Sequence, residues 1–241
     1  MFLRYATSCS LVVLTIFFLP QSIKAQTEPQ TEPAPAKKEE GAKVRVVCVQ
    51  SLNGKDETIT LAKKTEEGKW IESGDLTLSS SLITDWIRVP VGLNHIVRKN
   101  GVELTSIGSF TISPTIKGAI LILLPDVAKK VYRVQLVDPA KLEFGKGKAL
   151  IVNYSKIPAL VKMGKQTNTV APGQQVVETI TADGDGMYPM LIGHLDADKN
   201  TVLCYDRRIS SNPNTRTFLL LFPDPDTGLR AMTLSEFGPF E

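Results

Sequence analysis

The chain has 241 residues, and its 28 lysines and arginines nearly balance 25 aspartates and glutamates, for a formal net charge of +3. A chain so balanced lacks the concentrated basic footprint on which nucleic-acid binding depends, so we expect no nucleic-acid partner. Two histidines and three cysteines leave little scope for acid–base catalysis or for a dense disulfide framework.

Residues 1–25 have the pattern of a signal peptide. Arg4 supplies the positive charge ahead of the apolar core LVVLTIFFLP, and the segment SIKA ends in Ala25, a small residue suited to cleavage. The apolar run is shorter than the roughly 20 residues that a membrane-spanning helix needs. We therefore expect an exported protein, periplasmic or extracellular, with no transmembrane segment in the mature chain.

Residues 26–42 read QTEPQTEPAPAKKEEGA and contain no large apolar side chain. Such a segment cannot bury enough surface to offset the conformational entropy that ordering would remove. The composition predicts a disordered linker, rich in Pro, Glu and Thr, ahead of the folded part.

From residue 43 onward, short runs rich in Val, Ile, Leu, Thr and Tyr are separated by Gly, Pro, Asn and Asp, the pattern of an all-β protein. KNG at 99–101 predicts a tight hairpin, since Asn and Gly tolerate positive φ. The first half has predicted strands at 44–50, 58–63, 69–73, 86–90, 95–99, 108–113, 119–124 and 131–137. The second half has them at 149–155, 159–164, 175–180, 188–195, 201–207, 217–222 and 229–234.

One pattern occurs twice, 98 positions apart: ILILLPDVAKKVYRVQL at 120–136 and FLLLFPDPDTGLRAMTL at 218–234. Each copy has a continuous apolar run, which predicts a strand covered on both faces or central in a sheet. A Pro-Asp pair follows, and we expect the proline to end the strand because it cannot donate to the ladder. The segments VRVVCVQS and ALIVNYS match more loosely, as do RVPVGLNH and YPMLIGH.

This duplication predicts an all-β fold of two tandem β-sandwich units, residues 43–141 and 142–241, each of a size typical for one sandwich. A single large sandwich is the alternative. Trp70, Trp86, Tyr154 and Tyr188 lie in predicted strands, where we expect them to pack inward. In an exposed planar row they would instead stack on sugar rings.

Few residues are candidates for chemistry. His95 and His194 occupy similar places in the two halves, and we expect half-buried strand residues rather than catalytic groups. The chain has no GxSxG elbow, HExxH or Walker loop. EFGKGKA at 143–149 is followed by a predicted strand and not by the helix that a phosphate loop needs. We predict no catalytic residue and no cofactor.

Two acidic turns, ADGDGM and DADKN, offer the alternating oxygen donors that calcium loops use. The second departs from an EF-hand loop, because Thr201 and Arg207 stand where Gly and the bidentate Glu belong. Asp, Asn and Gly are also what hairpin turns need, and that role is favoured. The weak metal candidates are Asp183, Asp185, Asp196 and Asp198.

Arg207, Arg208 and Arg216 lie in DRRISSNPNTR, which we expect to be an exposed cationic loop. The loop is either an ordinary polar hairpin or a surface for an acidic glycan or a protein partner. Cys48 and Cys204 remain after removal of the leader. An oxidising compartment permits a disulfide between them, although both lie in strand-like runs where a thiol packs as a small hydrophobe.

In architecture, residues 43–241 resemble uncharacterised exported immunoglobulin-like β-sandwich proteins of Gram-negative bacteria, a resemblance that transfers no functional residue. We expect an exported, non-enzymatic structural, adaptor or ligand-binding protein of the bacterial cell envelope, with an envelope protein or a glycan as partner. A carbohydrate-binding module is one alternative. An envelope hydrolase or metal-dependent enzyme that uses His95 or His194 is another.

Overall fold

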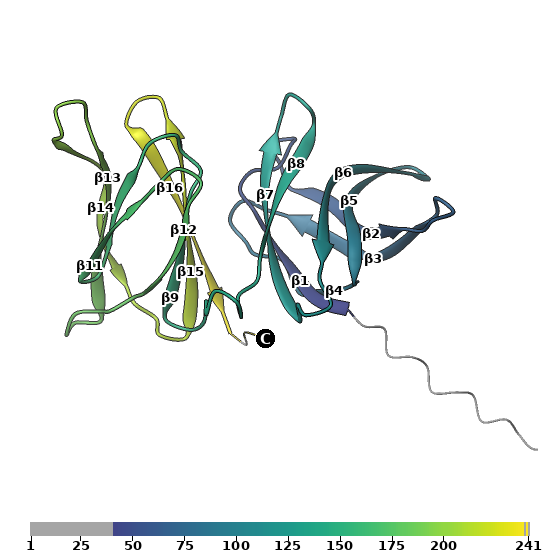
Figure 1. Ribbon diagram of the computed structural model, residues 1–241, viewed down its shortest axis with the longest axis horizontal. Coiled ribbons are helices and arrows are strands. Elements are labelled where there is room, and N and C mark those ends of the chain that lie inside the picture. Colours follow the sequence, from purple (N-terminus) through teal and green to yellow (C-terminus); the bar gives the residue numbers. More distant parts are fainter. Residues whose placement is uncertain (1–40, 239, 241) are drawn as a thin grey trace, which may run out of the picture. The chain divides into compact units, whose positions relative to one another are not determined.

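The computed structural model of the protein describes residues 41–238 and 240 (Figure 1). The predicted signal peptide and all but two residues of the predicted linker lie outside the described residues. In the described range the chain folds into strands, and no helix there is long and apolar enough to cross a membrane.

The strands of the first half are β1 (Gly41–Cys48), β2 (Glu57–Lys64), β3 (Trp70–Leu78), β4 (Ile87–Pro90), β5 (Gly92–Asn100), β6 (Glu103–Ile112), β7 (Gly118–Asp126) and β8 (Val131–Val137). Those of the second half are β9 (Lys148–Asn153), β10 (Ala159–Met163), β11 (Gln166–Val170), β12 (Gln175–Thr179), β13 (Met187–Leu195), β14 (Thr201–Ser210), β15 (Thr215–Asp224) and β16 (Gly228–Phe237). Every strand except β11 corresponds to a predicted one. The sequence QTNTV of β11 lacks the apolar residues on which the prediction relied.

Within residues 41–238 these strands form four sheets of four strands, paired as two sandwiches. Sandwich 1 combines the order β4-β1-β7-β8 with β3-β2-β5-β6, and sandwich 2 combines β12-β9-β15-β16 with β11-β10-β13-β14. Adding eight to each strand number of sandwich 1 gives the order in sandwich 2. The all-β fold with two tandem sandwiches is therefore confirmed, and the single large sandwich is wrong. The immunoglobulin-like resemblance stays a prediction.

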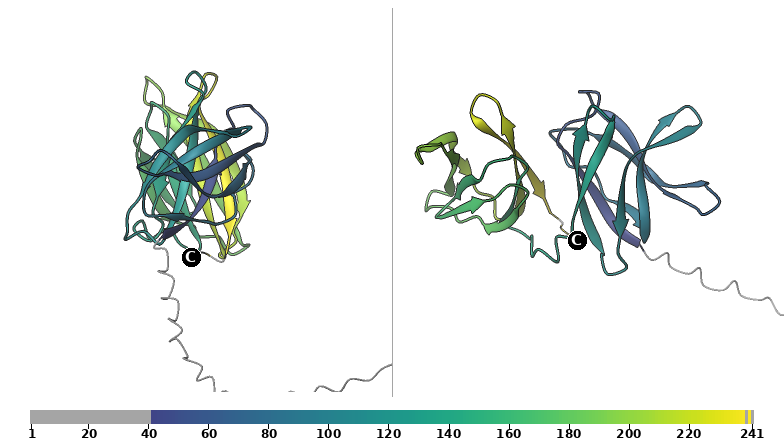
Figure 2. Two further views of the ribbon diagram at one scale, coloured as in Figure 1. Left: turned by 90° about the vertical axis from the view of Figure 1, so that its right-hand side faces the viewer. Right: turned by 45° about the horizontal axis from the view of Figure 1, so that its top comes forward.

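The strand registers also repeat. The first strand of each half runs parallel to the long apolar strand, with Val46 opposite Leu121 in β1 and β7, and Ile151 opposite Leu219 in β9 and β15. Parallel neighbours cannot be joined by a tight turn. The first and seventh strands of each half therefore become neighbours only after the five strands between them have folded. The predicted boundary at residues 141 and 142 lies in the connection between β8 and β9 (Figure 2).

The prolines of the repeated motif do not end their strands, contrary to expectation. Pro125 pairs with Tyr132, and the ladder of β7 continues to Asp126. The Leu123 carbonyl accepts a hydrogen bond from the Val49 amide on the β1 side. The ring nitrogen of Pro125, two residues further on, faces the same side but lies beyond the end of β1, so no ladder bond is lost. Pro223 repeats this arrangement beyond the end of β9.

Side chains of the long apolar strands alternate between two cores. In β7, Ala119, Leu121 and Leu123 face the core of sandwich 1, which the second sheet of that sandwich completes. The intervening residues, Ile120, Ile122 and Leu124, belong to a different cluster that includes residues of β9, β15 and β16. The continuous apolar run therefore marks a strand buried on both faces, as predicted.

Candidate functional site: the seam between the sandwiches

We call the facing surfaces of the sheets β4-β1-β7-β8 and β12-β9-β15-β16 the seam. Its apolar centre is one cluster of buried side chains drawn from both sandwiches and from the connection between them. The expected separate cores exist, but the seam adds a third. The cluster consists of Val47, Ile120, Ile122, Leu124, Val137, Phe144, Leu150, Val152, Phe218, Leu220, Phe222 and Leu234.

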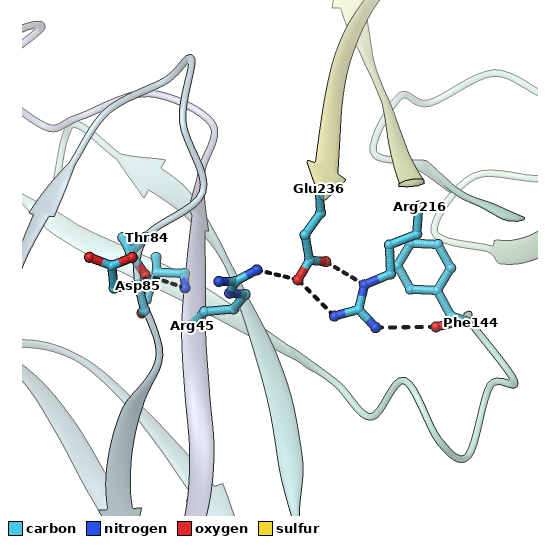
Figure 3. Close-up of polar contacts among 7 residues, drawn as sticks. Arg45, Thr84, Asp85, Phe144, Arg216 and Glu236 are labelled. Atoms are coloured by element: carbon cyan, nitrogen blue, oxygen red, sulfur yellow. Dashed lines mark hydrogen bonds and ion pairs between the residues drawn. The ribbon is translucent and has the colours of Figure 1, made fainter. Parts of the chain in front are cut away.

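An ion triad crosses the seam: Arg45 of β1, Glu236 of β16 and Arg216 of β15 (Figure 3). The Arg45 guanidinium donates to Glu236 Oε1, and Arg216 Nε donates to Glu236 Oε2. Arg216 Nη2 adds a bond of 3.0 Å to Oε1, which makes this pair bidentate, and Nη1 donates to the Phe144 carbonyl at 3.2 Å. The side chains of Glu236 and Arg216 are 1% and 2% exposed, so the pair is almost fully removed from water.

Aromatic rings cover both guanidinium groups of the triad. The Arg45 guanidinium lies 4.4 Å from the Trp86 ring centroid, and that of Arg216 lies 4.7 Å from Phe240 and 5.2 Å from Phe144. Ring faces attract cations, which offsets part of the excess positive charge of two arginines on one glutamate. Breaking a buried ion network by removing one partner costs about 3–5 kcal/mol, because the remaining charge stays buried without compensation. The triad therefore ties β1 of sandwich 1 to β15 and β16 of sandwich 2.

A second polar contact crosses the seam at another edge. The Tyr154 hydroxyl, just after β9, donates to Gln135 Oε1 of β8 at 2.5 Å. Gln135 Nε2 in turn donates to Gln175 Oε1 of β12 at 2.9 Å. Burial raises the pKa of Tyr154 well above its ordinary value, so the phenol remains a proton donor. Through these two hydrogen bonds, Gln135 of sandwich 1 is joined to both Tyr154 and Gln175 of sandwich 2.

The seam opens into a groove at the end that carries the two Pro-Asp hairpins. Two adjoining cavities of about 430 and 310 Å³ share Val49, Gln50, Phe222 and Arg230 as lining residues. We call this pair of cavities the seam groove. Each has the size of a small ligand site. The ring of Phe222 stacks on that of Tyr154 at 5.4 Å between centroids and forms an aromatic floor.

Of the predicted candidates, Arg216 belongs to the ion triad, whereas the histidines, the acidic turns and the two cysteines lie outside the seam. His95 Nδ1 is 3.1 Å from Ser106 Oγ, and the Trp70 ring meets the imidazole edge-on at 5.2 Å. Burial, followed by the charge of Lys64, lowers the pKa of His95. His194 lies in the other sandwich, with its two ring nitrogens each 3.1 Å from a main-chain carbonyl oxygen. The structure does not bring the two histidines into one site.

The acidic turns carry out structural tasks. Asp183 and Asp185 both pair with the Arg208 guanidinium, at 3.2 and 2.9 Å. Asp196 Oδ1 accepts hydrogen bonds from the Asp198 and Asn200 amides, as expected of a tight turn. In the part of the chain that the structure describes, no three His, Cys, Asp or Glu side chains group so as to hold a metal ion.

The predicted cationic loop is wrong in two respects. Arg207 and Arg208 lie within β14 rather than in a loop, and Arg208 is paired with acids. Arg216 is buried, because its strand lies at the centre of a sheet whose outer face is covered by sandwich 1. The three arginines therefore do not form one exposed surface.

The disulfide alternative is also wrong, because Cys48 and Cys204 are both free thiols. Cys48 is buried in the core of sandwich 1, whereas Cys204 packs against the core of sandwich 2. Burial raises the pKa of the Cys48 thiol to about 11, so the thiol stays protonated. Cys204 Sγ donates to the Thr227 carbonyl at 3.1 Å.

The aromatic residues do not form the exposed row that sugar binding would require. Tyr188 is buried in sandwich 2, and Trp70, Trp86 and Tyr154 are only partly exposed. Their contacts are with His95, Arg45 and Phe222 respectively. The expected inward packing is confirmed for Tyr188 in the core of sandwich 2 and for Tyr154 against the seam cluster, whereas Trp70 and Trp86 belong to no core.

Of the triad, Arg45 and Glu236 were missed because pattern analysis cannot pair them, and Arg216 was named for an exposed surface instead. Arg45 interrupts the apolar run VRVVC, a signal that a buried cation needs a counter-ion. The counter-ion, Glu236, is 191 positions away and lies in an ordinary polar run. Arg133 and Arg230, which line the seam groove, gave no local signal in the sequence.

No family model matches the chain, and no curated protein matches it. Among solved structures, a leucine-rich repeat protein from Bacteroides thetaiotaomicron aligns with 12% sequence identity and a TM-score of 0.24. The alignment covers 76% of this chain and 26% of that protein.

Proposed function

We propose that this chain is an exported, non-enzymatic protein of the bacterial cell envelope that acts as an adaptor or ligand-binding module. The observation that carries the proposal is the seam, where a buried ion triad and an apolar cluster join two sandwiches into one body. A preformed pair of domains presents binding surfaces from both at fixed geometry, which lowers the entropy lost on binding.

The bonding of the polar side chains supports a non-catalytic role. His95 contacts Ser106 and Trp70, and His194 contacts main-chain carbonyls, so neither forms a pair with an acid among the described residues. A carbohydrate module is less well supported than an adaptor, because Trp70, Trp86 and Tyr154 are engaged by His95, Arg45 and Phe222 and Tyr188 is buried. The leader and the Pro-rich segment of the sequence support export.

Export is tested by expressing the full chain in a Gram-negative host and measuring the intact mass in each cell fraction. We expect a chain that begins at Gln26 in the periplasm or the medium. A chain that keeps residues 1–25 and stays in the cytoplasm would contradict export.

The adaptor role is tested by cross-linking the exported protein in the envelope and reconstituting any captured complex from purified components. The exposed pair of Glu72 and Lys99 supplies a matched control for the buried triad. We expect a stoichiometric complex with the wild type and with Glu72→Gln, and a weaker complex with Glu236→Gln. If no component reconstitutes, or if Glu236→Gln binds as well as the control, the adaptor role is wrong.

A further inference from the structure

The seam groove receives one arginine from each copy of the duplicated hairpin. Arg133 of β8 lies opposite Leu124, and Arg230 of β16 lies opposite Phe222. Leu124 and Phe222 are equivalent residues 98 positions apart, and both belong to the apolar cluster of the seam. Directly opposite residues of antiparallel strands project from the same face. The duplication therefore brings two equivalent cations to one groove, which both of them line.

The charges of these two arginines are not neutralised within the described residues. Neither guanidinium forms an ion pair or a hydrogen bond there. The Arg230 guanidinium lies 5.6 Å from the Phe222 ring centroid, a contact that leaves its donors available. The lining of both cavities contains no carboxylate. Two unpaired guanidinium groups beside a low-dielectric wall attract an anion.

The nearest acid on the hairpin has another role. Asp224 Oδ1 accepts hydrogen bonds from the Asp226 and Thr227 amides and closes the β15–β16 turn. These bonds, with the Thr227 amide first, lower the pKa of Asp224, and the charge of Arg230 contributes less. Asp224 is held by its own turn and does not line the groove.

The rest of the groove is apolar, which selects among possible anions. Its wall includes Pro125, Pro223 and Val127, a residue that is 64% exposed. Apart from the arginines, the polar side chains that line the groove are Gln50, Ser80 and Tyr154, and the Tyr154 hydroxyl already donates to Gln135. A polyhydroxylated glycan would leave many hydroxyl groups unpaired on such a wall. A peptide with apolar side chains beside carboxylates would satisfy both the wall and the arginines.

We propose that the seam groove binds an extended acidic peptide segment of a partner protein, with its carboxylates on Arg133 and Arg230. The apolar side chains of the segment pack on Phe222 and the two prolines. This assignment rests on the adaptor role and names the chemistry of the partner. Along β15, Phe222 of the groove lies six positions from Arg216 of the triad, a distance of about 20 Å at the rise of a strand. Substitutions in the groove therefore leave the triad intact.

The test uses the full chain and three fluorescent probes in anisotropy titrations. The first is an eight-residue peptide of alternating Glu and Val, the second replaces each Glu with Gln, and the third is an oligogalacturonate. The test variant is Arg133→Gln with Arg230→Gln. The control variant is Arg88→Gln with Arg207→Gln, which removes the same charge from exposed residues outside the groove.

We expect the Glu-Val peptide to bind at least 10-fold more tightly than the Gln-Val peptide and than the oligogalacturonate. The groove variant should weaken the Glu-Val peptide at least 10-fold, and the control variant less than two-fold. Raising salt should weaken binding, because the contacts are ionic. Absence of binding, equal loss in both variants, or preference for the oligogalacturonate would overturn the assignment.

The outcome separates this assignment from the adaptor role. If the groove variant still forms the reconstituted complex while the Glu-Val peptide does not bind, the groove assignment is wrong and the adaptor role stands. If no complex forms with any variant, the adaptor role fails, whatever the peptide result.

Discussion

The two sandwiches share their strand order but differ in the polar side chains that form hydrogen bonds at one end of each core. In sandwich 1, the Tyr132 hydroxyl accepts a hydrogen bond from the Leu52 amide at 3.0 Å and donates to Glu57 Oε2 at 3.1 Å. Glu57 also accepts bonds from Arg98. Burial, together with the nearby Cys48, raises the pKa of Tyr132 far above its ordinary value.

Sandwich 2 fills the equivalent positions differently. Asn153 occupies the position of Cys48, since the two pair with Leu221 and Leu123 respectively. Asn153 Nδ2 donates to the carbonyls of Ile157 and Val170 at 2.9 and 2.8 Å. The side-chain amide of Asn153 thus holds a loop in sandwich 2, where sandwich 1 uses the three bonded side chains of Tyr132, Glu57 and Arg98.

The comparison shows what a duplication conserves. Sheet order, parallel pairing and a bulge recur, the bulge falling at Ile96/Val97 in one copy and at Ile192/Gly193 in the other. Backbone register resists change because a one-residue slip would turn every core side chain outward. Buried polar groups change more freely, provided that each new group finds its own partners.

The largest expected loss of stability comes from a substitution that breaks the ion triad between the two sandwiches. Glu236→Gln leaves Arg45 and Arg216 buried without a counter-charge, and should lower the free energy of unfolding by about 3–5 kcal/mol. Urea denaturation followed by tryptophan fluorescence measures the loss. Glu72→Gln, in the exposed pair with Lys99, should cost no more than about 0.5 kcal/mol. Equal costs for the two variants would show that the triad does not stabilise the seam.

The next prediction tests whether the Tyr132 network of sandwich 1 and the Asn153 bonds of sandwich 2 stabilise their cores independently. Tyr132→Phe leaves the Leu52 amide and Glu57 short of a partner. Asn153→Ala removes the two bonds that Nδ2 donates and the two that Oδ1 accepts from Ser155. Each should cost about 1–3 kcal/mol. The double variant should be additive within about 0.5 kcal/mol, because the sites lie in different cores. A coupling energy well above that value would contradict their independence.

Substitutions of the two cysteines should have smaller effects on the free energy of unfolding, and the cost should be larger for Cys48. Cys48→Ala opens a small cavity in a fully buried site and should cost about 1 kcal/mol. Cys204→Ala, at a partly exposed bulge, should cost less than about 0.5 kcal/mol. Labelling of the folded protein with a thiol reagent at pH 8 should modify Cys204 first, since the pKa of Cys48 is about 11. Faster labelling of Cys48 would show that its core opens readily.

The smallest effect concerns pH. Burial lowers the pKa of His95 in the folded state, so the unfolded chain takes up its proton at higher pH than the folded chain. Stability should therefore decrease as pH falls through about 6.5, the ordinary histidine pKa, and level off below the folded pKa. Thermal melts from pH 8 to pH 5 should show a smaller decrease for His95→Gln than for the wild type. NMR titration of the imidazole checks the direction of the shift directly, and a pKa above the ordinary value would refute it.

Strand positions were predictable wherever apolar residues mark them. The missed strand, β11, pairs its polar residues Gln166 and Thr167 with β10, whose apolar side chains supply the core contacts. The duplication was visible in the Pro-Asp motif. The offset of 98 positions between the two copies was correct for the first strand of each hairpin and wrong by one residue for the second strand. Leu136 pairs with Leu121, whereas Leu219 pairs with Thr233, because the second turn is shorter.

The sequence by itself determined the all-β fold, the tandem repeat and the two-sided burial of β7 and β15. These features follow from local periodicity, which reports how many faces of a strand are covered. Only the tertiary structure decided what covers those faces, and which charges meet there. Arg45 and Glu236, like Arg133 and Arg230, are brought together by the packing of one sandwich on the other. Such contacts depend on the three-dimensional path of the chain, and no spacing in the sequence encodes them.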